Sequence, residues 1–289
     1  MLSILTAFCH IVVTEESANS HERVFNMAYI IAIANQKGGV AKTTTAEHLG
    51  IGLAVKGFRV LLIDADPQGS LTASLGCRYP DELDMSLANI LQSIMEDTDL
   101  DPIGCIIHHD EGIDLLPGNI SLAVVEANMA NQMCREQILK TCIARINDEY
   151  AYDYIIIDCM PSLGILTTNA LACADSVLIP LQAAYLPVKG LQQLISTIGI
   201  VQKRLNRDLK IEGILITATD LRTNIAKDIV SLLQSNYGNR IRIFRTTIPN
   251  TCKLSESSAE GVSIYRYAPQ HKASLAYAAL VEEVLGNEN

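Results

Sequence analysis

Short apolar runs alternate with longer stretches of mixed apolar and polar residues along most of the chain. The runs are rich in Ile, Leu and Val, which is typical of strands buried on both faces. They predict strands over residues 29–34, 58–64, 113–116, 154–158, 176–180, 210–217 and 241–244. The stretches between them predict helices, notably at 42–56, 122–147, 190–205, 224–235 and 274–285.

Regular alternation of strand and helix favours an α/β fold. Parallel strands must be joined by crossover connections, and helices in those connections cover both faces of the sheet. We therefore predict a doubly wound, mainly parallel sheet. No internal repeat and no Pro-, Gly- or Ser-rich linker interrupts the pattern, so residues 27–289 are expected to form a single domain.

Residues 1–26 do not share this pattern. Residues 2–13 are mostly apolar but lack the basic start of a signal peptide, and residues 15–26 are polar. We interpret this stretch as an N-terminal extension that is disordered or that reflects an upstream start codon.

From the composition we expect a cytoplasmic protein. Hydrophobic residues make up 49% of the chain, which is ample for a core, and no apolar run reaches the roughly 18 residues of a membrane helix. The eight cysteines form no C-x-x-C pair, so scattered reduced thiols are favoured over a disulfide framework or a zinc site.

The charge is unevenly distributed. The net charge of −10 by itself argues against a nucleic-acid partner. Between residues 203 and 272, however, twelve Lys and Arg stand against six Asp and Glu. This segment indicates where a polyanion would be tolerated.

A phosphate-binding loop is predicted between the first strand and the first helix. Glycines at 38 and 39 let backbone N–H groups face an anion, and the helix N-terminus behind them favours negative charge. The loop carries two lysines, Lys37 and Lys42, and fits K-G-G-x-x-K-[ST] rather than the ordinary phosphate-loop pattern. Lys42 would reach the terminal phosphates and the Thr43 hydroxyl would bind Mg²⁺. The predicted nucleotide-binding residues are Lys37, Gly38, Gly39, Val40, Ala41, Lys42, Thr43 and Thr44.

Three aspartates stand at the ends of predicted strands. Asp64 and Asp66 are two residues apart, so their carboxylates share one face of an extended strand. Asp158 ends another strand as I-I-I-D, which suits a residue that binds Mg²⁺ directly or through water. The sequence therefore predicts a metal and water site beside the phosphate loop, with Thr43, Asp64 and Asp158 as metal ligands.

Three segments resemble the motifs of the ParA/MinD family of deviant Walker A ATPases. They are N-Q-K-G-G-V-A-K-T-T-T at 35–45, V-L-L-I-D-A-D-P-Q-G at 60–69 and D-Y-I-I-I-D-C-M-P-S-L-G at 153–164. Likeness continues through 178–182, 221–224 and 248–257, and within the family it is greatest to the ParA/Soj chromosome and plasmid partitioning branch.

This resemblance implies a slow ATPase that uses ATP and Mg²⁺ and is stimulated by a partner. ATP binding would join two subunits into a homodimer that binds DNA without regard to sequence. A ParB-like centromere-binding protein would stimulate hydrolysis and release the DNA, with no membrane involved. The protein would be cytoplasmic and associated with the nucleoid.

The resemblance also implies roles for individual residues. Lys37 would reach the partner subunit's phosphates, and Asp66 would orient the attacking water, so the catalytic set is Lys37, Lys42 and Asp66. Arg222 and Lys253 match positions that contact DNA. The chain departs from the family pattern at three positions, Ala41 for Gly, Met160 for Pro and Asn250 for Arg.

Three alternatives remain open. A MinD-like membrane-cycling ATPase is disfavoured, because the C-terminal A-L-V-E-E-V-L-G-N-E-N is acidic and anionic lipid would repel it. An iron–sulfur ATPase of the nitrogenase iron-protein type would need shared cluster cysteines, and Cys159 is more simply a small buried residue. A nucleotide-gated ATPase that positions a protein cargo without DNA is the third alternative.

Overall fold

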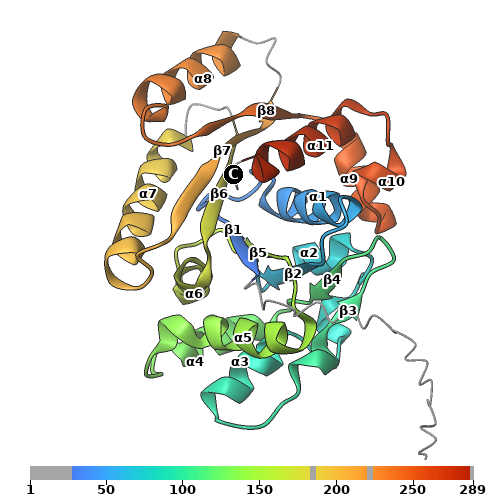
Figure 1. Cartoon of the computed structure of the whole chain (residues 1–289), viewed down its shortest axis with the longest axis vertical. Coiled ribbons are helices and arrows are strands. Elements are labelled where there is room, and N and C mark those ends of the chain that lie inside the picture. Colours follow the sequence, from blue (N-terminus) through green and yellow to red (C-terminus); the bar gives the residue numbers. More distant parts are fainter. Residues whose placement is uncertain (1–27, 183–186, 220–223, 287–289) are drawn as a thin grey trace, which may run out of the picture.

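The computed structural model describes residues 28–182, 187–219 and 224–286. These residues form one eight-stranded sheet in the order β3-β4-β2-β5-β1-β6-β7-β8, with helices on both faces (Figure 1). Neighbouring strands are parallel throughout, except for the antiparallel pair β3 and β4. The predicted α/β class and doubly wound, mainly parallel sheet are therefore confirmed.

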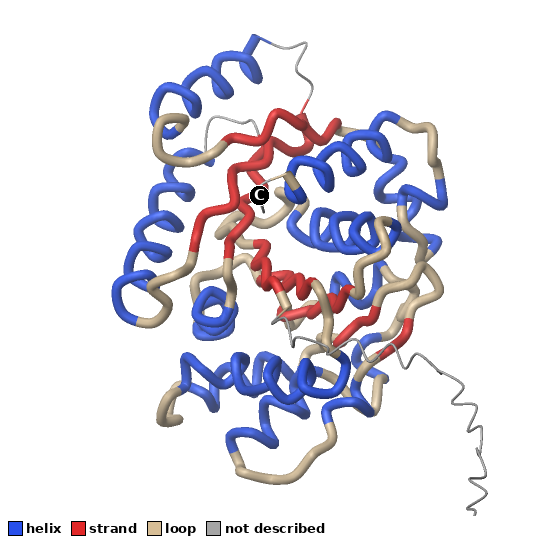
Figure 2. The backbone as a smooth tube through the Cα atoms, in the orientation of Figure 1, coloured by secondary structure: helices blue, strands red, loops and turns tan. Residues whose placement is uncertain are grey.

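Strands and helices follow one another along the described chain (Figure 2). The strands are β1 (Tyr29–Ile33), β2 (Val60–Ala65), β3 (Ile107–His108), β4 (Asp114–Leu116), β5 (Tyr154–Cys159), β6 (Ser176–Gln182), β7 (Lys210–Thr219) and β8 (Ile243–Pro249). The helices are α1 (Lys42–Val55), α2 (Ser70–Ser74), α3 (Leu87–Met95), α4 (Ser121–Met129), α5 (Ile138–Tyr150), α6 (Ile165–Cys173), α7 (Pro187–Arg204), α8 (Asn224–Tyr237), α9 (Cys252–Glu260), α10 (Ile264–Tyr267) and α11 (Lys272–Leu285). Short 3₁₀ helices are η1 (Pro80–Glu82), η2 (Pro102–Cys105) and η3 (Arg135–Gln137).

The sheet separates two hydrophobic cores. Successive side chains of a strand point to opposite faces, so Ile31 and Ile33 of β1 enter one core and Ala32 enters the other. The first core lies under α1, α2 and α11, and the second under α3 to α8. Burial on both faces explains why the central strands are almost continuously apolar.

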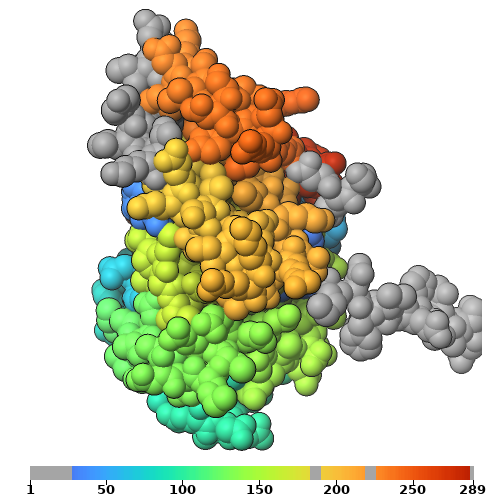
Figure 3. Space-filling model, turned by 90° about the vertical axis from the view of Figure 1, so that its left-hand side faces the viewer, coloured from blue at the N-terminus to red at the C-terminus, as the bar shows by residue number. Residues whose placement is uncertain are grey.

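One side of the molecule is covered by helices from the middle of the chain. Viewed from this side, α8 lies above α7, and the segment containing α4 and α5 lies below (Figure 3). Helices α7 and α8 contribute Leu194, Ile198, Ile229 and Leu233 to the second core. These helices close the face of the sheet opposite α1 and α11.

Strand β1 lies between β5 and β6, and the chain leaves it at the carboxyl edge of the sheet. The parallel neighbours β2 and β5 end at the same edge, with Asp64 and Asp158 paired in register. In open α/β sheets, ligands bind outside the carboxyl ends of strands where the strand order reverses. The predicted phosphate loop lies at this position.

Two element predictions are wrong in detail. The helix predicted over 122–147 is two helices, α4 and α5, because the chain turns between them and Cys134 has a left-handed backbone (φ 52°). The strand predicted over 241–244 begins at Ile243 and continues to Pro249. β8 lies at an edge of the sheet, and polar residues within it conceal the strand from an apolar pattern.

Several predictions fall on residues that the structure does not describe. The predicted extension over 1–26 lies outside the described residues, as does Arg222. Within the described ranges, no helix is both long enough and apolar enough to cross a lipid bilayer.

The edge strand β8 is bonded to a side chain from α11. Glu283 Oε1 accepts a hydrogen bond from the Thr246 N–H at 2.7 Å, and Oε2 accepts one from the Arg245 N–H at 3.0 Å. The Arg242 guanidinium donates to the Glu283 carbonyl and also lies over the Phe244 ring at 4.6 Å. These contacts fasten α11 to the sheet edge.

An unpaired carboxyl group lies in the core beneath α1. Glu47 is fully buried, and neither of its oxygens has a hydrogen-bond partner among the described residues. Burial, with a smaller contribution from Glu111, raises the pKa of Glu47 to about 8 against the lowering effect of Ser74. The folded protein therefore keeps this carboxyl protonated at neutral pH, whereas the unfolded chain loses the proton near pH 4.5.

Glu47 should make the protein less stable as the pH rises from about 4.5 to about 8, because the unfolded state loses its proton first. We expect Glu47→Met, of similar size and uncharged, to raise the free energy of unfolding by at least about 1 kcal/mol at pH 8. Urea unfolding at pH 5 and pH 8 measures the effect. The exposed Glu82→Gln is the control, and an equal loss of stability between the two pH values in wild type and Glu47→Met would refute the assignment.

Candidate nucleotide-binding site

The loop between β1 and α1 has the backbone that a phosphate site needs. Gly39 has a φ of 72° and Ala41 a φ of 64°, both in the left-handed region. Helix α1 begins at Lys42, so its first N–H groups face the loop. The N-terminus of this 14-residue helix attracts anions.

Hydrogen bonds from neighbouring strands hold the loop in place. The Asn35 amide donates to the Pro180 carbonyl of β6 at 2.7 Å, and its oxygen accepts from the Lys37 N–H at 3.0 Å. The Thr217 hydroxyl of β7 donates to the Val40 carbonyl at 2.9 Å. The loop is therefore fixed before any ligand binds.

The two lysines of the loop have different surroundings. Lys42 is buried, and its ammonium donates to the Lys37 carbonyl across the loop at 3.3 Å. The Lys37 side chain is exposed. Lys42 is thus built into the loop, whereas Lys37 is open to solvent.

Asp158 is the clearest candidate for holding a cation. It is buried, and both carboxylate oxygens lack hydrogen-bond partners among the described residues. Burial and the neighbouring Asp64 hold its pKa well above the usual range, while the nearby Thr43 hydroxyl and Lys42 ammonium lower it. A buried carboxylate left unpaired costs free energy, which a bound Mg²⁺ would offset.

Asp64 and Asp66 have partners of their own. Asp64 Oδ2 accepts hydrogen bonds from the Thr72 N–H (2.8 Å) and hydroxyl (2.7 Å), and burial raises its pKa to about 6. Its Oδ1 accepts from the Asp66 N–H at 3.2 Å, and Asp66 Oδ1 accepts from the Gln68 N–H at 2.9 Å. Asp64 thus positions the start of α2, and its predicted role as a metal ligand stays a prediction.

Among the described residues, no three His, Cys, Asp or Glu side chains form a metal-binding group. At a nucleotide site Mg²⁺ takes few protein ligands and keeps waters and phosphate oxygens. Thr43 and Asp158 fit such an ion.

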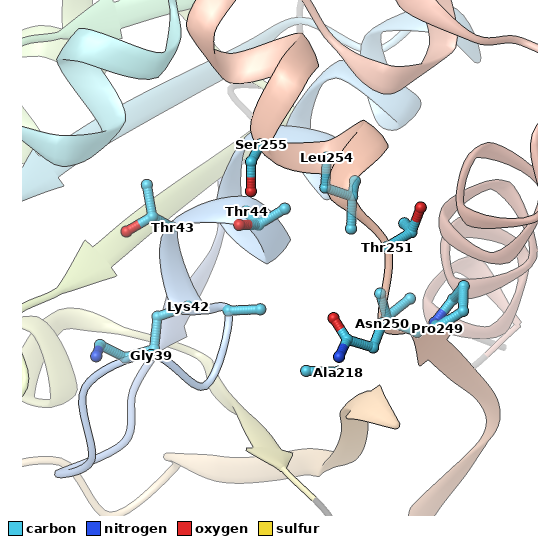
Figure 4. A pocket seen from close by; sticks show the side chains of 12 residues that line it. Gly39, Lys42, Thr43, Thr44, Ala218, Pro249, Asn250, Thr251, Leu254 and Ser255 are labelled. Atoms are coloured by element: carbon cyan, nitrogen blue, oxygen red, sulfur yellow. The ribbon is translucent and has the colours of Figure 1, made fainter. Parts of the chain in front are cut away.

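A cavity of about 300 Å³ adjoins the loop. One wall is the loop itself and the start of α1, and the opposite wall is the segment from β8 into α9 (Figure 4). Asn250 and Thr251 face Lys42 and Thr44 across the opening (Figure 4). Because Lys42 and Thr43 line this cavity and also lower the pKa of Asp158, phosphates and metal would meet at these two residues.

The cavity wall includes residues that the sequence analysis did not assign to the site. They are Ala218, Ile248, Pro249, Asn250, Thr251, Leu254 and Ser255. Most of them lie in the segment 248–257, so the family resemblance of this segment is the one sequence signal that could have assigned them to the site. Asn250, which departs from the family pattern, lies in the cavity.

Lys253, a predicted DNA contact, already binds a neighbouring side chain of α9. Its ammonium donates to Glu256 Oε2 at 2.6 Å and lies 5.5 Å from the Tyr267 ring centroid. Tyr267 also donates to Glu256, at 2.9 Å. Lys253 is therefore available to an external phosphate only in competition with Glu256.

Met160 and Cys159, both considered in the sequence analysis, lie in or against the core. Met160, where the family pattern has Pro, packs against the second core. Cys159 is buried beside Asp158, and burial raises the pKa of its thiol, as for a small core residue.

Together the sheet, the loop with its lysines and the buried aspartate define a P-loop nucleoside-triphosphate-binding protein. The protein family described as AAA domain matches residues 28–211. The chain is 41% identical over 261 residues to the sporulation initiation inhibitor protein Soj of Bacillus subtilis, covering 90% of this chain and 100% of Soj. It is 42% identical over 258 residues to the chromosome partitioning protein ParA of Myxococcus xanthus, covering 89% and 87% of the two chains.

Solved structures show the same likeness. A Mycobacterium smegmatis protein named cobyrinic acid a,c-diamide synthase, with bound ADP and magnesium, has a TM-score of 0.77 and 38% identity, covering 91% of this chain and 96% of that one. A plasmid partition protein of Borrelia burgdorferi has a TM-score of 0.69 and 28% identity, covering 91% and 100%. The chain belongs to the ParA and Soj family of partitioning P-loop ATPases.

Ala41 should strain the loop, since a left-handed backbone costs an L-residue about 1–2 kcal/mol. We expect Ala41→Gly to raise the free energy of unfolding by about 0.5–1 kcal/mol, after the greater flexibility of glycine when unfolded is allowed for. Thermal unfolding measures the change. Ala130→Gly, at an exposed position with a right-handed backbone, should instead destabilise, and a destabilised Ala41→Gly would show that Ala41 carries no strain.

Proposed function

We propose that the protein is a partitioning ATPase of the ParA/Soj type. In this proposal it binds ATP and Mg²⁺, forms a homodimer, binds DNA non-specifically and hydrolyses ATP when a ParB-like partner stimulates it. It would act in the cytoplasm on the nucleoid, to segregate a chromosome, plasmid or mobile element. Similarity to Soj and ParA over nearly the whole chain supports this assignment.

A single observation carries the nucleotide part of the proposal. The unpaired buried carboxylate of Asp158 lies beside Thr43 and Lys42, at the point where the phosphate loop meets the cavity. A magnesium ion with bound phosphate would give Asp158 a cationic partner and would give the loop the anion that its N–H groups accept. No other described side chain has this combination of burial, missing partners and position.

Each side chain has one task in the proposed reaction. Lys42 neutralises the transferred phosphate, and Thr43 and Asp158 hold the cation against it. Asp66 orients the attacking water, and the exposed Lys37 reaches the phosphates bound by a second subunit. Phosphoryl transfer needs little beyond such positioning and charge neutralisation.

The DNA part rests on the basic segment 203–272 and on Lys253. Contacts of lysine and arginine with phosphates bind DNA without reading its sequence and are weakened by salt. The ion pair of Lys253 with Glu256 implies that DNA must displace Glu256 to gain this contact.

Protein-cargo positioning without DNA is one competing function, and the diamide synthesis named for three similar solved structures is another. Neither is favoured by a particular contact in this chain. ATP-dependent DNA binding distinguishes the partition function from these two functions.

Lys42→Ala should abolish nucleotide binding, because it removes the buried ammonium of the loop. For wild-type protein, Mg²⁺–ATP at about 100 times Kd should add roughly 2.7 kcal/mol of stability. The variant should show no such shift in thermal unfolding. Lys140→Ala, on the exposed face of α5, is the control, and full ATP stabilisation of Lys42→Ala would refute the loop assignment.

ATP-dependent DNA binding is the main test of the proposed function. Asp66→Ala should bind ATP normally, lose at least about 100-fold in turnover and hold duplex DNA in a salt-sensitive complex. Fluorescence anisotropy with ATP, with ADP and without nucleotide, at two salt concentrations, measures this binding.

Two variants on α9 should then change the DNA affinity in opposite directions. Lys253→Glu should weaken it, and Glu256→Gln should strengthen it a few-fold by releasing Lys253. Absence of DNA binding under all conditions, with ATP binding intact, would favour the protein-cargo function.

A further inference from the structure

The ring of His48 joins the phosphate-loop helix to the C-terminal helices. His48 lies in α1, four residues after Thr44, and is fully buried. Its Nε2 accepts a hydrogen bond from the Ile264 N–H at 2.9 Å, so this nitrogen carries no proton. Its Nδ1 then carries the proton and donates to the Thr44 carbonyl at 2.8 Å. Burial lowers the pKa of His48 to about 4, which keeps the ring neutral at physiological pH.

Two tyrosines of the C-terminal helices also contact His48. Tyr277 of α11 stacks on it with ring centroids 4.8 Å apart and planes 22° apart. The Tyr265 hydroxyl of α10 donates to the His48 carbonyl at 3.0 Å. The ring therefore has no alternative position without breaking contacts to two helices.

The residues bonded to His48 lie next to one wall of the nucleotide cavity. Ile264 is the first residue of α10, and α9 ends four residues earlier at Glu260, with Gly261 as its C-cap. Helix α9 contributes Leu254 and Ser255 to the cavity wall that faces the phosphate loop. On the other side of the bond, Thr44 lines the loop wall. His48 therefore connects Thr44 in one cavity wall to α10, the helix that follows the α9 wall.

Two more contacts fix α9 and α10 at the same place. The Glu111 carboxylate accepts hydrogen bonds from the Ser263 N–H at 2.8 Å and from its hydroxyl. Gly261 lies against Gly76 at the end of α2, where a Cβ on Gly261 would come within 2.7 Å of the Gly76 Cα. These contacts anchor the far end of α9 to other parts of the chain, and the bonds of Ile264 and Tyr265 to His48 connect it to the phosphate-loop helix.

We propose that His48 is a positioning residue that sets the separation of the two cavity walls, so that the phosphates and the nucleoside of one ATP are bound together. The inference rests on the proposed ATP binding and is independent of DNA. Its distinguishing consequence is that loss of the Ile264 bond weakens binding of a ligand that touches both walls. A ligand that touches only the phosphate loop is unaffected.

Isothermal titration calorimetry with ATP and with inorganic tripolyphosphate, both with Mg²⁺, tests this inference. His48→Leu, which fills the space but accepts no hydrogen bond, should lower the ATP affinity about five- to tenfold. Its tripolyphosphate affinity should stay within about twofold of wild type. His48→Gln, whose amide oxygen can replace Nε2 as acceptor, should restore ATP affinity to within about threefold of wild type.

Two further variants separate positioning from general stability. Val284→Ala removes buried packing from α11 but leaves the His48 bonds, and should change neither affinity. Tyr265→Phe removes a single hydroxyl and should lower ATP affinity about two- to threefold without affecting tripolyphosphate. If His48→Leu does not fold, the Tyr265→Phe comparison decides the matter.

Equal changes in both affinities, or no change in ATP affinity, would overturn the inference. Failure of wild-type protein to bind ATP would overturn it together with the proposed function. Wild-type protein that binds ATP but not DNA would overturn the partition function alone.

Discussion

The parallel pairing of β1 with β5 on one side and β6 on the other is the constraint on which the rest of the structure depends. It brings the end of β1 level with Asp158, since Ile33 and Asp158 are partners in register. It also places the Pro180 carbonyl of β6 where Asn35 can hold the loop. A shift of β1 by one residue would exchange its two faces and separate the loop from the carboxylate.

Around this centre the site combines rigid support with unsatisfied charge. Hydrogen bonds from β6 and β7 fix the loop backbone. The Asp64 oxygens accept hydrogen bonds from Thr72 and from the Asp66 N–H. Asp158 is the exception, because its oxygens have no partner among the described residues. The site is thus preorganised in every respect except one, and that one is what a cation with bound phosphate would supply.

Much of this could be predicted from the sequence, because the information was local. Central strands are buried on both faces, so β1, β2 and β5 stand out as apolar runs, and the glycines and lysines of the loop are contiguous. The wall formed by Asn250, Thr251 and Ser255 was not predicted, because nothing local in that segment shows that β8 ends opposite the loop. The bond from His48 to Ile264 spans 216 positions in the chain, and no periodicity reveals such a contact. The ends of β8 were misplaced for a related reason, since an edge strand carries polar residues on its exposed side.

The hold of Glu283 on β8 has a consequence for how copies of the chain can associate. The backbone N–H groups of Arg245 and Thr246 are bonded to a carboxylate of the same molecule. A second chain that tried to extend the sheet by adding a strand there would first have to displace that carboxylate and leave it without its donors. The β8 edge of the sheet is therefore protected against intermolecular β-pairing at these two residues.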